Sequence, residues 1–314
     1  MTPLESGLYH AAKDGKAIVV SSFLAYEPKI NPNWTDAGGW TALHVASFNG
    51  HAAIVAQLLS HPGIDVNHRN DSLITPFFLA CNGGDEGVVK LYLKDPRTEL
   101  NLPGPQSCTP LWIACRYGCS KIVKWMIASG RHVEWGKMGK PWGSDELLAP
   151  VDIAQREGHE ETATLLEEFL SNPEKLRHRV KLELGILDEL AADMFAVVVF
   201  LCDDLLKTRS LRTTHPATRF CHVAAALPME LQMILCHRVV GSPKETVLSR
   251  HSEPAFRKLA SQLAQETSST VPSNSEGASN SGCAGAALTN PTMLPAYLFG
   301  AFFLGLGASI WFRH

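Results

Sequence analysis

The stretch Thr41-Ala-Leu-His-Val-Ala-Ser-Phe-Asn-Gly-His51 contains the start and the end signals of one short helix. Thr41 is a good N-cap, because its hydroxyl accepts a hydrogen bond from a backbone N–H that has no partner inside the helix. Leu43 and Ala46 lie three residues apart and so share one helical face. Gly50 suits the left-handed conformation that ends a helix. The stretch therefore predicts a short helix with one apolar face.

A second helix is predicted directly after Gly50, since Ile54, Val55, Leu58 and Leu59 recur at helical spacing. Together the two segments form a helix–turn–helix unit. A unit of this size leaves its apolar faces uncovered unless a neighbour of the same kind packs against it. We therefore expect further copies of the unit along the chain.

The further copies are present at a regular spacing. The glycine at the turn recurs at spacings of 35, 34, 34 and 40 residues, as Gly15, Gly50, Gly84, Gly118 and Gly158. An apolar residue stands seven positions before each glycine: Leu8, Leu43, Phe77, Leu111 and Val151. An alanine stands four positions before each: Ala11, Ala46, Ala80, Ala114 and Ala154. Self-similarity at this period indicates stacked units that bury their faces against one another.

The starts of the units identify a family. They read TALH at Thr41, TPFF at Thr75 and TPLW at Thr109, and the segments IDVN and ELN end at Asn67 and Asn101. In these residues the chain resembles ankyrin repeats, with about five units in residues 1–170. The resemblance implies an all-α solenoid of helix–turn–helix units with β-hairpin fingers, in which a concave surface binds a protein partner.

The chain departs from the family pattern in two respects. Only His44 keeps the histidine that follows the apolar residue, and the other repeats have Phe78, Trp112 and Asp152 instead. We expect these replacements to weaken local hydrogen bonding without changing the fold. The fourth finger, Arg131–Leu148, contains an insertion of about six residues, and the finger carries Trp135, Trp142 and several glycines. It should protrude further than the others.

Composition narrows the class of function. The chain has 314 residues with a net charge of −3, which gives no basic footprint for nucleic acid. Its N-terminus lacks the charged and apolar regions of a signal peptide, so we expect the repeats to lie in the cytosol. The glycosylation sequons at Asn33 and Asn70 would then be unused.

The eight cysteines fit a reducing compartment. Cys81 and Cys115 occupy a small-residue position of the repeat, which predicts buried thiols. Neither the group Cys108, Cys115 and Cys119 nor the pair Cys221-His222 and Cys236-His237 has the C-x2-C spacing of zinc modules. We expect no metal site and no cofactor.

Residues 171–262 are predicted to form a helical domain that caps the repeats, with a buried helix over Leu187–Leu206. The segment 227–235, which reads LPMELQMIL, is loosely similar to the opening of an F-box, a module that docks to ubiquitin-ligase adaptors. A proline-started amphipathic helix explains the same letters. Both interpretations stay open from the sequence.

The end of the chain changes character twice. Residues 263–292 are rich in Ser, Asn, Gly and Ala and predict a disordered linker. Residues 293–312 are free of charge, and twenty residues at about 1.5 Å each span roughly 30 Å, the thickness of a bilayer core. They resemble a tail anchor in the endoplasmic reticulum or the mitochondrial outer membrane, which the sequence does not resolve. Their small residues Ala301, Gly305 and Ser309 suggest a weak homodimer contact.

The function indicated is protein binding. The chain contains no phosphate-binding loop, nucleophile elbow or His-Glu-x2-His motif, so we expect no enzyme. Carried onto this chain, the partner-binding positions implied by the resemblance are Trp40, Phe48, Asn49, Ile74, Asn82, Arg116 and Tyr117. The sequence therefore predicts an adaptor that holds a cytosolic partner at a membrane. Two alternatives remain: a ubiquitin-ligase substrate receptor that uses residues 227–235, and a soluble ankyrin scaffold.

Overall fold

The computed structural model describes residues 3–26, 30–202, 224 and 226–268. The chain divides into two compact units, Met1–Val180 and Lys181–His314. Each unit is described here by itself.

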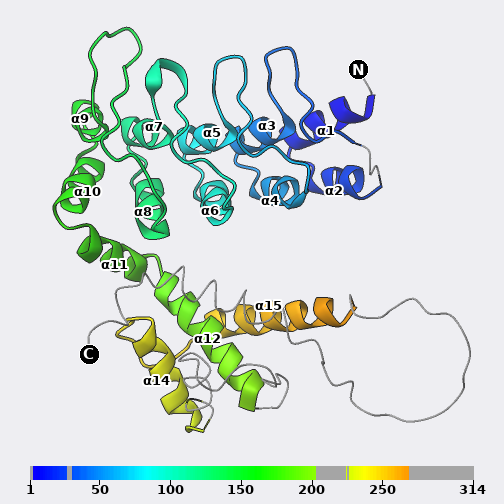
Figure 1. The fold of residues 1–314 in the computed structure, drawn as a ribbon, viewed down its shortest axis with the longest axis vertical. Coiled ribbons are helices and arrows are strands. Elements are labelled where there is room, and N and C mark those ends of the chain that lie inside the picture. Colours follow the sequence, from blue (N-terminus) through cyan, green and yellow to red (C-terminus); the bar gives the residue numbers. More distant parts are fainter. Residues whose placement is uncertain (1–2, 27–29, 203–223, 225, 269–314) are drawn as a thin grey trace, which may run out of the picture. The chain divides into compact units, whose positions relative to one another are not determined.

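The first unit is a stack of helix pairs (Figure 1). One row contains the first helix of each pair: α1 (Pro3–Lys13), α3 (Ala42–Phe48), α5 (Pro76–Gly83), α7 (Pro110–Arg116) and α9 (Pro150–Arg156). The other row contains the second helix: α2 (Ala17–Tyr26), α4 (Ala52–Ser60), α6 (Glu86–Lys94), α8 (Ser120–Ser129) and α10 (Glu160–Ser171). We call these the inner and the outer helices. The loops that join an outer helix to the next inner helix project beyond the inner row as four fingers (Figure 1).

The helix ends follow the sequence signals. The hydroxyls of Thr41, Thr75 and Thr109 each accept a hydrogen bond from the backbone N–H three residues on, at 3.2–3.3 Å. All five turn glycines have φ between 64° and 79°, the left-handed region that favours glycine. The predicted apolar faces form the core, and Leu43, Phe77 and Leu111 are buried with the alanines three positions after them. The ankyrin-like stack of helix pairs is thus confirmed.

The fingers differ from the β-hairpins that the resemblance implied. Among the described residues they contain only two isolated antiparallel bridges, Thr35 with Thr41 and Gly139 with Leu148, and no strand. The reason lies in the finger tips. There the carboxylate of Asp36 and the amide oxygen of Asn70 each accept two backbone N–H groups, at 2.9–3.0 Å. Side chains thus provide acceptors that a strand ladder would otherwise supply.

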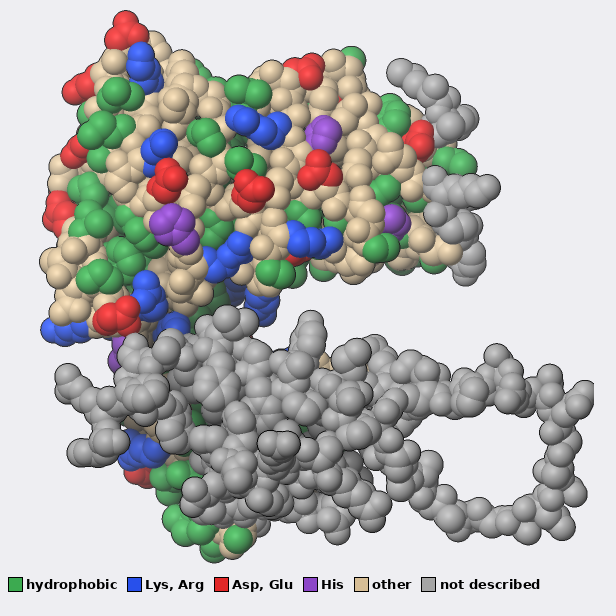
Figure 2. Space-filling model, viewed as in Figure 1, with side chains coloured by type: hydrophobic (Ala, Val, Ile, Leu, Met, Phe, Trp, Pro, Cys, Tyr) green, Lys and Arg blue, Asp and Glu red, His purple; other side chains and the backbone are tan. Residues whose placement is uncertain are grey.

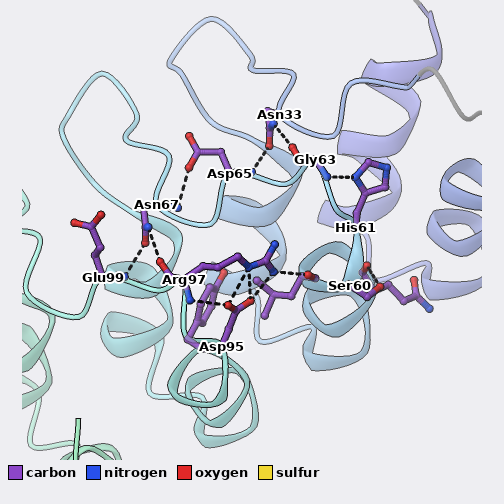
Figure 3. A network of polar contacts seen from close by, with 12 residues as sticks. Asn33, Ser60, His61, Gly63, Asp65, Asn67, Asp95, Arg97 and Glu99 are labelled. Atoms are coloured by element: carbon purple, nitrogen blue, oxygen red, sulfur yellow. Dashed lines mark hydrogen bonds and ion pairs between the residues drawn. The ribbon is translucent and has the colours of Figure 1, made fainter. Parts of the chain in front are cut away.

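Asparagines clamp each finger base to the next (Figure 3). The side-chain nitrogen of Asn33 donates to the carbonyl of Gly63 at 2.8 Å, and its oxygen accepts from the N–H of Asp65 at 2.8 Å. Asn67 makes the same pair of bonds to Arg97 and Glu99, at 2.8 and 2.9 Å. Asn101 repeats them with His132 and Glu134, at 3.1 and 2.8 Å. One residue type at a 34-residue spacing thus ties four fingers together.

Arginines stabilise the C-terminal ends of three outer helices. Arg97 donates to the carbonyl of Leu59 at 2.6 Å, Arg131 to those of Tyr92, Asp95 and Thr98, and Arg177 to that of Ile127 at 3.2 Å. Leu59, Tyr92 and Ile127 lie in the last turn of an outer helix, where a carbonyl has no N–H four residues on inside the helix, and a cation there also opposes the helix dipole. Each arginine comes from a later segment than the helix it caps, so the caps also join neighbouring units of the stack.

At the position of the family's histidine, a side chain donates a hydrogen bond to the backbone of the following finger in two repeats. His44 is fully buried, and its Nε2 lies 3.0 Å from the carbonyl oxygen of Ile74, just before the next inner helix. Trp112 donates from its indole Nε1 to the equivalent carbonyl, that of Leu148, at 2.9 Å. Phe78 and Asp152 offer no such donor: the ring of Phe78 packs against Gly104, and the carboxylate of Asp152 accepts from the N–H of Ala149 at 3.1 Å. The expectation of weakened hydrogen bonding was therefore wrong for Trp112.

The fourth finger occupies residues 130–149, compared with 61–75 and 95–109 for the two before it, which confirms the insertion. Its two tryptophans have different environments. The ring of Trp135 packs on Phe169 of α10 with centroids 4.4 Å apart, whereas Trp142 is about half exposed. Helix α11 (Pro173–Glu183) then buries Leu176 and Val180, both on the repeat side of the boundary between the units.

The second unit contains three described helices, α12 (Ile186–Cys202), α14 (Met229–Val239) and α15 (Ser249–Ser268). Helix α12 packs against both others and buries Phe195 and Val198, as expected for the predicted buried helix. The carboxylate of Asp188 is buried and pairs with Lys244. This pair fastens the loop between α14 and α15 to α12.

Two predictions concern the end of the chain. Helix α15 extends to Ser268, so residues 263–268 of the predicted linker are helical. They continue the helical pattern because the linker composition becomes dominant only beyond them. No described helix is both long and apolar enough to cross a membrane. The predicted anchor, 293–312, lies outside the described residues, together with the rest of the linker.

Candidate protein-binding surface

Exposed apolar side chains gather on one side of the repeat stack. We define the finger face as the fingers together with the C-terminal ends of the inner helices. Six large hydrophobic side chains on it are 48–53% exposed: Phe48, Leu73, Tyr117, Met138, Trp142 and Leu147. Among the outer helices, α4, α6 and α8 expose none, whereas those at the two ends of the stack expose Ile18 and Val19 (α2) and Leu170 (α10). Exposed apolar side chains that cluster mark interaction sites more often than scattered ones do.

The predicted residues Trp40 and Phe48 form an aromatic pair on the finger face. Phe48 ends α3 and is 49% exposed, whereas Trp40, at the end of the first finger, is half-buried. Their rings meet edge to face with centroids 6.3 Å apart. Trp40 also approaches the ring of His44, at 5.9 Å. The structure thus brings Trp40 and Phe48 together, with Phe48 as the accessible member.

Three of the predicted residues take part in the fold or lie deeper. Asn49 is exposed, but its side-chain nitrogen donates to the carbonyl of Lys13 in the preceding repeat at 3.2 Å. Ile74 is half-buried and supplies the carbonyl that accepts from His44. Asn82 is half-buried, and it is the residue of the third repeat that corresponds to Phe48 in the second and Arg116 in the fourth. Of the three, only Asn49 offers much surface.

Arg116 and Tyr117 form a second cluster at the end of α7. Tyr117 is 48% exposed, and Arg116 is half-buried beside it. The guanidinium carbon of Arg116 lies 4.5 Å from the ring centroid of Trp142, 5.9 Å from that of Tyr117 and 6.0 Å from that of Trp112. These distances are typical of cation–π contacts. The fourth finger therefore contributes Trp142 to a cluster whose other members, Trp112, Arg116 and Tyr117, belong to α7 and its C-terminal end.

Sequence reasoning missed Leu73 as a candidate. Its φ is 63°, in the left-handed region, at the position where the first finger has Gly39 with φ 75°. A left-handed conformation costs a residue with a side chain about 1–2 kcal/mol, and such strain gathers at functional positions. Leu73 is also 52% exposed. The signal was present in the sequence, since position 73 aligns with a glycine one repeat earlier.

Burial fixes the protonation state of one histidine and three cysteines of this unit near neutral pH. Burial lowers the pKa of His44 to about 4, so its imidazole is neutral. Burial also raises the pKa of Cys108 to about 11 and moves those of Cys81 and Cys115 still higher, so these thiols stay protonated. Both Cys81 and Cys115 are fully buried, as predicted. No group of three or more potential ligands among the described residues could hold a metal ion.

Charge on the repeat unit is mixed. Figure 2 shows acidic and basic side chains interspersed over the viewed face, without a continuous field of either sign. Several charges of the repeat unit are paired, as in Arg156 with Glu146 at 3.5 Å and Lys140 with Asp145 at 3.6 Å. A surface of this kind suits a protein partner better than a polyanion.

Comparison with known proteins agrees with this fold. Residues 4–70 match the family model described as ankyrin repeats (3 copies), and residues 106–134 match the one described as ankyrin repeat. The chain therefore contains ankyrin repeats, which generally act as protein-interaction scaffolds. Rabankyrin-5 of Mus musculus is 36% identical over 73 residues, which cover 23% of this chain and 6% of the mouse protein. The match thus spans only a small part of that relative.

Proposed function

We propose that this chain is a non-catalytic adaptor that binds a cytosolic protein on its finger face. The observation that carries the proposal is the distribution of exposed apolar side chains along the stack: six lie on the finger face, none on the outer helices α4, α6 and α8, and the remaining outer helices, at the two ends, expose Ile18, Val19 and Leu170. Phe48, Tyr117 and Trp142 belong to residue types that supply contact area at protein interfaces. The ankyrin repeats support the same role.

The test compares partner capture with folding. Full-length chain carrying Phe48→Ala and Tyr117→Ala should lose the proteins that the wild-type chain captures from cells. Its melting temperature should stay close to that of the wild type, because both side chains are about half exposed. A double variant that captures the same proteins at the same level would reject the finger face as the binding surface.

We further propose that residues 293–312 anchor the adaptor in a membrane. Their twenty residues carry no charge, and Tyr297 and Trp311 lie near opposite ends, where interfacial aromatics occur. Alkaline carbonate extraction of the expressed chain should leave it in the membrane pellet. Leu304→Arg should release it, because an arginine at the helix centre costs about 2.5–3.5 kcal/mol of insertion free energy. Release of the wild-type chain by carbonate would reject the anchor.

A second candidate function is that of a ubiquitin-ligase substrate receptor. Its support is α14, in which Met229 and Leu231 are 59% and 47% exposed, directly after Pro228 at the N-cap. Exposed apolar residues at the start of a helix are available for docking to an adaptor subunit. Co-purification of a ubiquitin-ligase adaptor with the wild-type chain, and its loss in Leu231→Asp, would favour this candidate. If neither chain retains an adaptor, the candidate fails.

A further inference from the structure

Arg116 occupies a fixed position on the finger face. Its guanidinium lies among the rings of Trp112, Tyr117 and Trp142, at the distances given above. Its backbone is held as well, since the carbonyl of Arg116 lies 3.0 Å from Nε2 of His159 in the next repeat. Rings on several sides limit the rotamers of a long side chain, so little further entropy is lost when Arg116 binds a partner.

No acceptor among the described residues binds this guanidinium, and its Nη1 is buried without a hydrogen bond. The other arginines of the repeat unit all have acceptors: Arg69, Arg97, Arg131, Arg156, Arg177 and Arg179. A guanidinium carries five N–H donors, and buried donors that stay unpaired are costly. Arg116 is thus an exception that the fold does not explain.

The chemistry of the cluster indicates what would satisfy it. The planar fork of a guanidinium matches the two oxygens of a carboxylate. The half-exposed rings of Tyr117 and Trp142 beside it offer apolar contact area. We propose that Arg116 anchors a partner segment that presents an Asp or Glu carboxylate next to an apolar or aromatic side chain. This proposal rests on the proposed function and specifies the partner it selects.

The neighbouring charges favour a carboxylate over a phosphate. The equivalent residue one repeat on, Arg156, pairs with Glu146, and Lys140 of the fourth finger pairs with Asp145. The cluster therefore offers one guanidinium without an acid, whereas these two other cations of the next repeat and the fourth finger are already paired. A monoanion needs only that one cation, whereas a phosphate dianion is bound best by several.

The experiment uses a displayed library of random peptides, selected on the purified full chain in mild detergent. Peptides bound by the finger face should be enriched in Asp or Glu beside an aromatic or aliphatic residue. The affinity of a selected peptide should fall about tenfold or more in Arg116→Gln. Replacing the peptide's Asp by Asn, or its Glu by Gln, should cause a similar loss. The two changes together should cost little more than either alone, because they remove the same contact.

Arg156→Gln is the matched control, since Arg156 is the exposed counterpart of Arg116 and is already paired. It should leave peptide affinity unchanged. Arg116→Lys is a second test variant, because it keeps the charge but loses the planar fork, and its affinity should also fall. Both Arg116 variants should unfold at the wild-type temperature, which separates a lost contact from a lost fold.

The outcomes distinguish the two proposals. If selected peptides lose affinity in Phe48→Ala with Tyr117→Ala but not in Arg116→Gln, the carboxylate proposal is wrong and the finger face remains the binding surface. Enrichment of basic peptides, or stronger binding of phosphorylated than of acidic peptides, would also overturn the carboxylate proposal. If no peptide is selected, or binding ignores every change on the finger face, both proposals fail.

Discussion

The bases of the fingers and the finger face differ in how regularly their residues recur from repeat to repeat. At the bases, Asn33, Asn67 and Asn101 make the same two hydrogen bonds at a 34-residue spacing. On the finger face the side chains at the ends of the inner helices vary instead: the positions that correspond to Phe48 and Asn49 are Asn82 and Gly83 in one repeat and Arg116 and Tyr117 in another. The difference separates two tasks. Residues that recur in each repeat hold neighbouring repeats together. Residues that differ from repeat to repeat have no such shared structural role, so they can determine which partner binds.

The largest expected effect concerns His44, which belongs to the periodic part. Its pKa is about 4 in the folded chain because it is buried, compared with about 6.5 when unfolded. The unfolded state therefore binds the proton more readily, and stability is lost as pH falls from about 6.5 to 4. The loss should reach about 3 kcal/mol. Urea unfolding across this pH range measures it.

His44→Gln is the control for that pH dependence. Glutamine has no proton to gain in this range, so the slope of the unfolding free energy between pH 6.5 and 4 should flatten. The acidic residues whose charges act on the ring, Asp36 and Asp65, are the same in both chains. An unchanged slope in the variant would show that His44 is not the source.

The second effect concerns an asparagine clamp. Asn67→Ala removes one donor and one acceptor that join two finger bases, which should lower the unfolding free energy by about 2 kcal/mol. Asn49→Ala is the matched control, since Asn49 is exposed and makes a single bond to Lys13. It should cost less than about 1 kcal/mol. Equal losses in the two variants would contradict the distinction between clamps and finger face.

A third prediction compares the stability lost when the hydroxyl of a buried tyrosine, Tyr92, or of an exposed one, Tyr117, is removed. Tyr92 is fully buried, and its hydroxyl lies 2.7 Å from that of Ser47 in the preceding repeat. Tyr92→Phe should lower stability by about 1 kcal/mol, because this hydrogen bond is lost without a cavity. Tyr117→Phe should change stability by less than about 0.5 kcal/mol. Thermal or urea unfolding of both variants provides the comparison.

The smallest effect has the opposite sign. Leu73→Gly removes the strain of a left-handed leucine and should raise the unfolding free energy by about 0.5–1 kcal/mol. If Leu73 touches the partner, the same change should weaken partner binding. Ser107→Gly relieves the equivalent strain in the next finger, where φ is 64°, and should stabilise without affecting binding. Destabilisation by Leu73→Gly would show that its conformation is not strained.

The periodic part was predictable because it repeats. The turn glycines and the alanines follow from local rules that act five times, and the threonine caps from a rule that acts three times, so each copy supports the others. The asparagine clamps were also visible as a 34-residue period, but their bonds join residues about 30 positions apart, which spacing alone does not pair. For the same reason the replacement of a histidine bond by Trp112 could only be seen in three dimensions.

The finger face was predictable only in part. The sequence predicts Phe48 and Tyr117 as partner-binding because they occupy positions that the family resemblance implies, and both are about half exposed. Trp142 joins Arg116 from an insertion that no other repeat has, so no internal comparison could locate its contact. Ile74 and Asn82 were placed on the surface by analogy, but their exposure depends on how the neighbouring fingers pack.

The most direct test of the central claim measures the affinity of one selected peptide together with the stability of two double variants. The first carries Phe48→Ala and Tyr117→Ala on the finger face. The second carries Lys94→Ala and Lys121→Ala, two exposed residues on the outer helices α6 and α8. We expect the first to lose about tenfold or more in affinity, the second to lose none, and both to unfold like the wild type. Equal losses of affinity in the two variants would contradict the finger face as the binding surface. So would a loss of affinity in the first variant that is accompanied by a matching loss of stability.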